Sequence, residues 1–231
     1  MKLVVRDVAT LFGVSEKAVY RWISGQKLPA HRINDQYRFN RIELLEWATS
    51  NRVPLPLEIF REDGLAGFYE LREALESGGI HTLASIKDKA ALCSELVRLL
   101  PLPGPEERGN LKEVLLARES LGATGIGGGV AIPHVQNPVV IHIKSPVVSL
   151  CFLSTPLLLD SIDGLPVHAL FSIVSPTISG HLRLLARLSF ALQKAGFKDA
   201  ISKRAGVSEI LSEAGVIDAL IKSLPPETEG T

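Results

Sequence analysis

The sequence predicts a chain of two domains, a mainly α-helical one at the N-terminus and an α/β one at the C-terminus. Length, charge and the spacing of apolar residues predict this division. The chain has 231 residues, enough for two modest domains. Residues 1–52 hold nine Lys/Arg against five Asp/Glu, whereas the remainder has four more acidic than basic residues. Apolar residues follow a helical period near the N-terminus, and Val-, Ile- and Leu-rich segments alternate with helical ones beyond it.

The overall composition is that of a globular protein. Hydrophobic residues make up 46% of the chain and charged residues 22%, which excludes disordered and fibrous classes. The two cysteines, Cys93 and Cys151, lie in apolar segments and are predicted to be buried thiols. No leader-like segment and no apolar run of about 18 residues occurs, so we expect a cytoplasmic protein without membrane insertion.

The first elements are two short helices. One helical face is apolar, at Val5, Val8, Ala9 and Phe12. Gly13 is typical of the position that follows a helix, and Ser15 is a favourable N-cap for a second helix over 16–24. Two helices joined by three residues predict a helix-turn-helix unit.

A hairpin and a third helix complete this region. Asn34 and Asp35 tolerate the positive φ of a tight turn, so residues 30–33 and 37–39 are predicted to pair. Asn40, with an acidic residue three positions later, predicts the start of a helix that runs through Trp47.

The domain boundary is predicted near two prolines, Pro54 and Pro56. We therefore assign residues 1–52 to the first domain, 53–66 to a linker, 67–224 to the second domain and 225–231 to a tail. In the second domain, helices are predicted over 66–77, 87–100, 106–121, 179–195 and 206–223. Strands are predicted over 130–134, 147–154 and 166–174.

The second helix carries polar residues suited to nucleic acid. Lys17, Tyr20 and Arg21 can contact phosphates and base edges if this helix enters a major groove. Arg32 and Arg38 of the hairpin are placed to contact the DNA backbone. The alternative is a small helical module for protein–protein contact, with an ordinary charged surface.

The N-terminal segment resembles the excisionase and MerR-like winged helix-turn-helix family. The residues that carry the resemblance are the runs Val8–Ile23, Gln26–Ala30 and Tyr37–Phe39. The resemblance implies DNA binding. One such unit reads few base pairs, so a homodimer or an auxiliary contact is expected.

The run from Thr124 to His134 places a histidine behind a glycine-rich loop. Histidine can carry a phosphoryl group, and glycines let backbone N–H groups approach one. The loop residues singled out for this role are Thr124, Gly125, Gly127 and Gly128. The run matches neither a dinucleotide fingerprint nor a P-loop, and the histidines lack metal-ligand spacing. We therefore expect no cofactor and no metal.

Two further side chains are expected beside this histidine. Arg118 lies on or beside the apolar stripe of its predicted helix, where a cation needs an anionic partner. His181 faces inward at the first turn of its helix, and a helix N-terminus favours anions and a neutral imidazole. Convergence of Arg118, His134 and His181 would stabilise a phosphoryl group. The alternatives are two core histidines and an arginine that extends to solvent.

Residues from about 68 to 222 resemble the type-2 EIIA domain of the bacterial phosphoenolpyruvate-dependent phosphotransferase system, the mannitol/fructose and nitrogen-related class. The matching motifs are Ala117–Gly127, Val130–His134, Asp163–Phe171, and Ser175-Pro176 with His181–Leu185. The resemblance implies a mixed sheet flanked by helices, with His134 accepting the phosphoryl group on Nε2. It also implies roles for His181 and Arg118 in the active site, and a histidine-containing phosphocarrier protein as the transient donor.

One departure from the family pattern follows the histidine. The family commonly has a small residue and then Arg or Lys there, whereas this chain has Val135 and Gln136. The leading hypothesis is a transcriptional regulator in which phosphorylation of His134 alters DNA binding. The alternatives are an EIIA component of sugar uptake and a scaffold that is not phosphorylated.

Overall fold

The structure of the chain is a computed structural model, and residue contacts divide it into two units. The residues that the structure describes are 3–25, 28–51, 53–60, 69–84, 86–121, 125–132, 143–159, 161 and 163–224. One unit comprises residues 1–68 with 219–231, and the other comprises residues 69–218.

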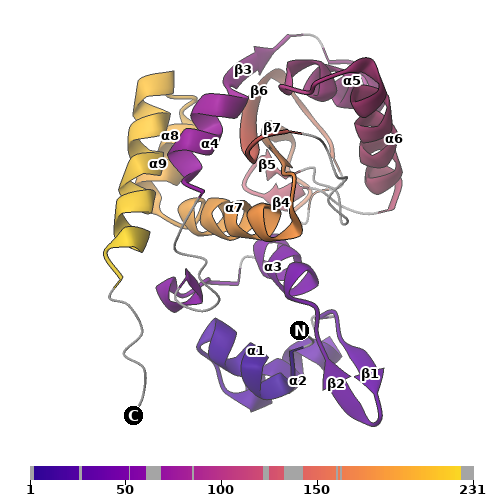
Figure 1. The fold of residues 1–231 in the computed structure, drawn as a ribbon, viewed down its shortest axis with the longest axis vertical. Helices are drawn as coiled ribbons and strands as arrows, with labels where there is room; N and C mark the ends of the chain where they lie inside the picture. The colour runs from indigo at the N-terminus through magenta and orange to yellow at the C-terminus, as the bar shows by residue number, and fades with distance from the viewer. Residues whose placement is uncertain are drawn as a thin grey trace. The chain divides into compact units, whose positions relative to one another are not determined.

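The N-terminal unit is mainly helical, as predicted (Figure 1). Its elements are α1 (Val5–Phe12), α2 (Glu16–Gly25), β1 (His31–Ile33), β2 (Gln36–Arg38), α3 (Arg41–Ser50) and the 3-10 helix η1 (Leu57–Phe60). Three aromatic side chains join the helices at the centre of the core. The ring centroid of Trp22 lies 5.7 Å from that of Phe12 and 5.2 Å from that of Trp47. These large apolar rings supply much of the buried area that holds so small a unit together.

The segment after α3 is packed rather than fully exposed. Val53, Leu55 and Phe60 are all buried, and the last of them ends η1. Apolar side chains thus continue a core beyond residue 52. The domain boundaries assigned from the sequence remain a prediction.

The second unit contains a mixed five-stranded sheet. The strands are β3 (Ile80–Leu83), β4 (Gly125–Gly127), β5 (Val130–Ala131), β6 (Val147–Leu157) and β7 (Val167–Val174). Their order is β3-β6-β7-β5-β4. The β3/β6 and β5/β7 pairs are parallel, whereas the β6/β7 and β4/β5 pairs are antiparallel. The predicted α/β class with a mixed sheet is confirmed.

Helices flank this sheet on both faces, as Figure 1 shows. The helices are α4 (Leu71–Gly78), α5 (Lys89–Leu99), α6 (Pro105–Leu121), α7 (Ile178–Ala191), α8 (Ala195–Ser202) and α9 (Val207–Lys222). Helices α5 and α6 cover one face, where Val97 and Leu111 pack with Val147 and Val174 of the sheet. On the other face Phe171 of β7 contacts Phe197 of α8, with ring centroids 6.2 Å apart.

Several elements differ from the sequence prediction. Strands β3 and β4 and helix α8 were not predicted, and the helix predicted over 179–195 ends earlier, as α7, at Ala191. The main chain leaves α7 at Leu192 and re-enters a helix after Lys194, which is the extended N-cap of α8. Apolar residues keep the helical period across this junction, so the pattern alone does not reveal it.

Both cysteines are buried free thiols, as predicted. Burial without a nearby charge raises the pKa of Cys151 to about 12. Among the described residues, no helix combines the length and the apolar character needed to cross a membrane.

Candidate functional site

The junction of α1 and α2 has the geometry of a tight helix-turn-helix. Gly13 adopts a left-handed φ of 63°, and its N–H is directed at the carbonyl oxygens of Ala9 and Thr10. Such a C-cap is favourable for glycine because it has no Cβ. Ser15 then accepts a hydrogen bond from the N–H of Ala18 at 3.3 Å and so caps α2. The two caps fix where the first helix ends and the second begins.

Helix α2 presents one buried and one exposed face. Val19 and Trp22 are buried, whereas Lys17, Tyr20 and Arg21 are exposed. The exposed fraction of Tyr20 is 49%, which is high for a tyrosine in a folded protein. All three predicted contact residues of α2 are therefore accessible to a ligand.

The β1–β2 hairpin has the tight turn that the sequence predicts. Asn34 and Asp35 have φ values of 49° and 59°, and their strands pair in antiparallel fashion. Arg32 is 3.0 Å from the carboxylate of Asp35, and Nη2 of Arg38 donates to Gln36 at 2.8 Å. Both arginines therefore have internal partners, and DNA phosphates would have to compete with them.

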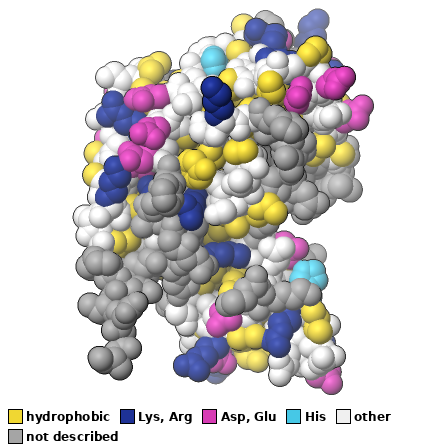
Figure 2. Space-filling model, in the orientation of Figure 1, with side chains coloured by type: hydrophobic (Ala, Val, Ile, Leu, Met, Phe, Trp, Pro, Cys, Tyr) yellow, Lys and Arg dark blue, Asp and Glu magenta, His cyan; other side chains and the backbone are white. Residues whose placement is uncertain are grey.

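One aromatic contact joins the hairpin to α2. The rings of Tyr20 and Tyr37 meet edge to face with centroids 6.1 Å apart. On the face shown in Figure 2, Lys and Arg side chains of the N-terminal unit are interspersed with apolar and acidic ones. The surface of this unit is therefore mixed in charge and polarity, and the Tyr20–Tyr37 contact joins α2 to the β1–β2 hairpin on it.

In the second unit, two parallel strands direct their carboxyl ends to the same edge of the sheet. Val130 and Ala131 of β5 pair with Ala169 and Leu170 of β7. Helix α7 begins four residues after β7, so its first turn lies at this edge. Ligand sites of α/β sheets are commonly found at such edges.

His181 belongs to the first turn of α7 and is buried, with 2% of its surface exposed. Its N–H donates to the carbonyl of Thr177, the N-cap residue, at 3.1 Å. Thr177 Oγ1 in turn accepts a hydrogen bond from the N–H of Gly180 at 3.1 Å. The helix N-terminus is therefore fixed by its cap, and the imidazole lies close to the positive end of the helix dipole.

Residues 125–131 of the glycine-rich run form the β4–β5 hairpin. Its second strand, β5, leads to that edge of the sheet. Gly127, Gly128 and Gly129 all have positive φ, at 86°, 66° and 74°. The N–H of Gly128 donates to Asp163 Oδ2 at 2.7 Å, a short hydrogen bond to a carboxylate. At Gly129 a Cβ would lie 2.4 Å from Cδ2 of His168, so only glycine fits there. A carboxylate and an imidazole thus hold the turn from the 163–168 segment.

The environment of His168 favours its neutral form. Burial lowers its pKa first, and the charge of Arg204 lowers it further, although hydrogen bonding to backbone groups opposes both effects. Arg204 itself donates to the carbonyl of Leu153 at 2.7 Å. A neutral His168 beside a glycine turn is a packing and hydrogen-bonding element of the hairpin.

Metal binding has no support in the part of the chain that the structure describes. Within it, no three His, Cys, Asp or Glu side chains are grouped closely enough to hold a metal ion.

Comparison with known proteins assigns both units. Residues 73–213 match the family model described as phosphoenolpyruvate-dependent sugar phosphotransferase system, EIIA 2. The chain belongs to this family. Residues 3–52 match a helix-turn-helix domain. The EIIA domain and the helix-turn-helix domain recognised from the sequence are thereby confirmed.

The relatives of the EIIA domain are named for more than one function. A nitrogen regulatory protein of Pseudomonas aeruginosa is 33% identical over 49% of this chain and 73% of that protein. A fructose-specific EIIABC component of Bacillus subtilis is 32% identical over 65% of this chain, but the match spans only 23% of that protein. A solved structure described as a PTS IIA protein of Streptococcus mutans has a TM-score of 0.51 at 18% identity, covering 65% of this chain and 96% of that one. The match to this solved structure shows that the two folds are alike.

The structure describes only some of the predicted site residues of the EIIA domain. His134 and Thr124 lie outside the described residues. Arg118 belongs to α6, although its side chain is likewise outside the description. Gly125 and Gly127 are the ends of β4, whereas His181 lies at the carboxyl edge of the sheet.

Gly128 was predicted as part of a phosphate-binding loop, and its N–H donates to Asp163. Neither Asp163 nor His168 was predicted as a site residue, although both lie in a family motif. The sequence signal that could have indicated this segment is Asp163-Gly164, a turn-forming pair shortly before a strand.

Proposed function

We propose that the chain is a transcriptional regulator linked to the phosphotransferase system, in which phosphorylation of His134 alters DNA binding. The observation that carries the proposal is the union of an EIIA domain and a helix-turn-helix domain in one chain. A nitrogen regulatory protein among the relatives supports a regulatory role. The phosphoryl donor is a histidine-containing phosphocarrier protein, which binds transiently.

The order of the elements supports His134 as the acceptor. His134 follows the last residue of β5 by three positions, and β5 runs parallel to β7 toward the edge where α7 begins. A phosphoryl group transferred to Nε2 of His134 forms a P–N bond as the P–N bond of the donor breaks. His181 at the α7 N-terminus and the guanidinium of Arg118 would stabilise the charge on the transferred group. Transfer then depends mainly on positioning.

The link to DNA binding is electrostatic. A phosphohistidine adds a charge of about −1.5 to −2, as other phosphorylated side chains do, to residues 67–224, whose fifteen Lys/Arg and fifteen Asp/Glu otherwise balance. That charge repels nucleic acid and changes any surface that the EIIA domain offers to a partner. DNA binding through Lys17, Tyr20 and Arg21 would respond to it. A homodimer would let two helix-turn-helix units read a longer site.

A phosphotransfer assay tests the acceptor. The chain is incubated with phosphoenolpyruvate, enzyme I and the phosphocarrier protein, and its intact mass is measured. We expect one phosphoryl group on the wild type and on His81→Ala, but none on His134→Ala. A phosphoryl group retained by His134→Ala would refute the assignment. Its absence from the wild type would favour the unphosphorylated scaffold, a role compatible with Val135 and Gln136 after the histidine.

A binding assay tests the regulatory half of the proposal. DNA duplexes are selected from a random-sequence library with the wild-type chain and titrated with phosphorylated and unphosphorylated protein. We expect Arg21→Ala to weaken binding and Lys203→Ala, an exposed change outside the helix-turn-helix, to leave it unchanged. Equal affinity of the two phosphorylation states would instead favour an EIIA component of sugar uptake, as the fructose-specific relative suggests.

A further inference from the structure

A groove runs between α5 and α6 on the surface of the EIIA domain. Its volume is about 470 Å³. The lining residues are Ser94, Val97 and Arg98 of α5 with Arg108, Gly109 and Lys112 of α6. Three of these six residues are cationic and none is acidic. The volume lies in the range of sites that hold part of a ligand or a few side chains of a partner.

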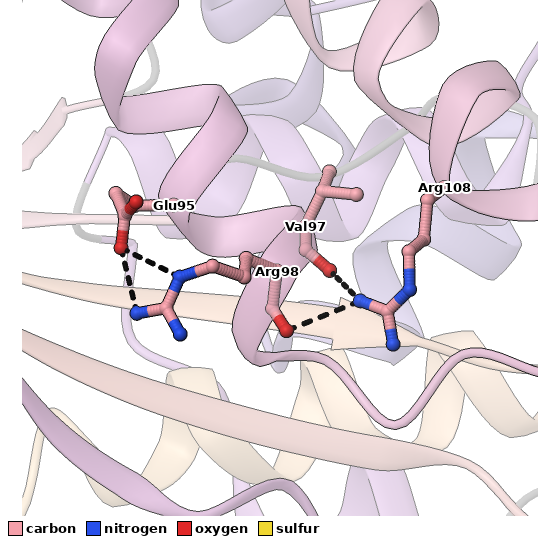
Figure 3. Close-up of polar contacts among 4 residues, drawn as sticks. All are labelled: Glu95, Val97, Arg98 and Arg108. Carbon is pink, nitrogen blue, oxygen red and sulfur yellow. Dashed lines mark hydrogen bonds and ion pairs between the residues drawn. The ribbon is translucent and has the colours of Figure 1, made fainter. Parts of the chain in front are cut away.

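One of the cations is rigidly held. Nη1 of Arg108 donates to the carbonyls of Val97 and Arg98 at 2.7 and 3.1 Å (Figure 3). Nη2 donates to the carbonyl of Leu102 at 3.2 Å. Carbonyls at the C-terminal end of a helix lack partners within the helix, so the guanidinium caps α5. Its positive charge is therefore fixed in the groove wall before any ligand arrives.

The opposite wall carries a second oriented cation. Nε and Nη2 of Arg98 donate to Oε2 of Glu95 at 3.0 and 2.8 Å, as Figure 3 shows. The side chain of Arg98 nevertheless remains 65% exposed. Lys112 follows Arg108 by four residues and so lies on the same side of α6. Arg108 and Lys112 thus place positive charge on the α6 wall, and the exposed Arg98, partly compensated by Glu95, adds to it on the α5 wall.

Gly109 is unfavourable for α6 and has no packing role. It lies inside a 17-residue helix, where glycine costs about 1 kcal/mol relative to alanine. A Cβ built on Gly109 would meet nothing within 4 Å, so no neighbouring atom requires a glycine there. Here Gly109 leaves the groove open between the cations.

We propose that the α5–α6 groove docks an acidic segment of a partner protein. Carboxylates of the segment would lie over Arg98 and Lys112, and an apolar side chain would lie beside Val97 and Gly109. A compact anion fits less well because Nη1 and Nη2 of Arg108 already bind the carbonyls of Val97, Arg98 and Leu102, so this guanidinium has no free pair of donors to offer. Cations spread along two walls instead match several carboxylates in a row.

The test uses the full-length chain and a defined probe. A synthetic peptide of alternating Glu and Leu is titrated into the ¹⁵N-labelled protein, and amide chemical shifts are followed. We expect the shifts to centre on Gly109, Lys112 and the end of α5. The same peptide with Gln in place of Glu should bind at least about tenfold more weakly, because its charge complement is lost. Shifts confined to the helix-turn-helix, or equal binding of the two peptides, would overturn the proposal.

Variants separate the groove from the fold. Gly109→Leu fills the groove with a good helix former, so it should maintain or raise Tm while peptide binding falls at least about tenfold. Lys112→Glu should weaken binding similarly, whereas Lys198→Glu on α8 makes the same charge change outside the groove and should leave it intact. Wild-type affinity in a folded Gly109→Leu would refute the site. Inorganic phosphate that competes with the peptide at equal strength would assign the groove to small anions and also refute it.

Discussion

Arg187 and Asp218 form an ion pair that is closed off from water, with 1% and 3% of their side chains exposed at an N–O distance of 2.7 Å. Burial lowers the pKa of Arg187, and Asp218 opposes that shift. Asp218 also accepts the N–H groups of Leu71 and Arg72 at 3.0 and 2.9 Å. One carboxylate thus joins α7 and α9 to the first turn of α4, where an anion is favoured.

Removal of this carboxylate should strongly destabilise the EIIA domain. Asp218→Ala leaves a buried guanidinium and two amides of α4 without their acceptor, and breaking such a pair costs about 3–5 kcal/mol. Denaturant unfolding measures the loss, with the exposed change Glu209→Ala on the same helix as the control. Arg187→Met in the Asp218→Ala background should recover part of it. A loss as small as that of Glu209→Ala would contradict this account.

His168 should make stability depend on pH. Its pKa is lowered in the folded chain, so the unfolded chain binds the proton more tightly. The free energy of unfolding should therefore fall as pH drops below about 6.5, the ordinary histidine value, toward the lower folded pKa. Denaturant unfolding at pH 7.5 and 5.5 measures this slope. His168→Gln, which cannot titrate, should have a smaller slope, and an unchanged slope would place its origin elsewhere.

Among the elements, the β4–β5 hairpin shows how steric and conformational limits act together. Gly129 has a φ of 74° and the ring of His168 occupies the space of a Cβ, whereas Gly164 has a φ of 67° with nothing within 4 Å. The two glycines therefore share one constraint and differ in the other.

This pair of glycines gives a matched test. Gly164→Ala should cost about 1–2 kcal/mol, the penalty of a left-handed conformation alone. Gly129→Ala should cost more, because the methyl group also collides with His168. The free energies of unfolding of the two variants and of Gly129→Ala/His168→Ala measure the difference. Equal costs for the two single variants would show that the ring moves aside without penalty.

The elements that could be predicted are those with local signals. A helix was predicted over 106–121, and the structure has α6 at Pro105–Leu121, where a proline and two acidic residues in the first turn are local start signals. Strand β3 has only four residues, and its pairing partner β6 begins more than sixty residues later. The bond between Asp163 and Gly128 likewise spans 35 residues. Such long-range pairings have no local periodicity, so the sequence pattern did not reveal them.

At the scale of the whole molecule, charge is distributed unevenly along the chain. The helix-turn-helix region has a small basic excess, and its arginines Arg32 and Arg38 already have internal partners. Affinity for DNA should therefore be moderate and sensitive to ionic strength, because it depends on release of counterions.

A salt titration of DNA binding tests this expectation. If Lys17, Arg21, Arg32 and Arg38 each neutralise one phosphate, log K should fall against log salt with a slope of about −4. Arg21→Ala should reduce that slope by about one, and Lys198→Ala should not. A slope near zero would argue that the N-terminal unit binds protein rather than DNA.

The long-range hydrogen bonds of Asp218 determine how late in synthesis the EIIA domain can be completed. Leu71 and Arg72 leave the ribosome long before the carboxylate that accepts their amides, which lies 146–147 residues later. The first turn of α4 therefore lacks this acceptor until Asp218 of α9 has been synthesised. A fragment cut to the family match at 73–213 would lack both ends of this arrangement and leave Arg187 without its counter-charge. The acceptor that completes the first turn of α4 is thus supplied from α9, more than 140 residues later in the chain.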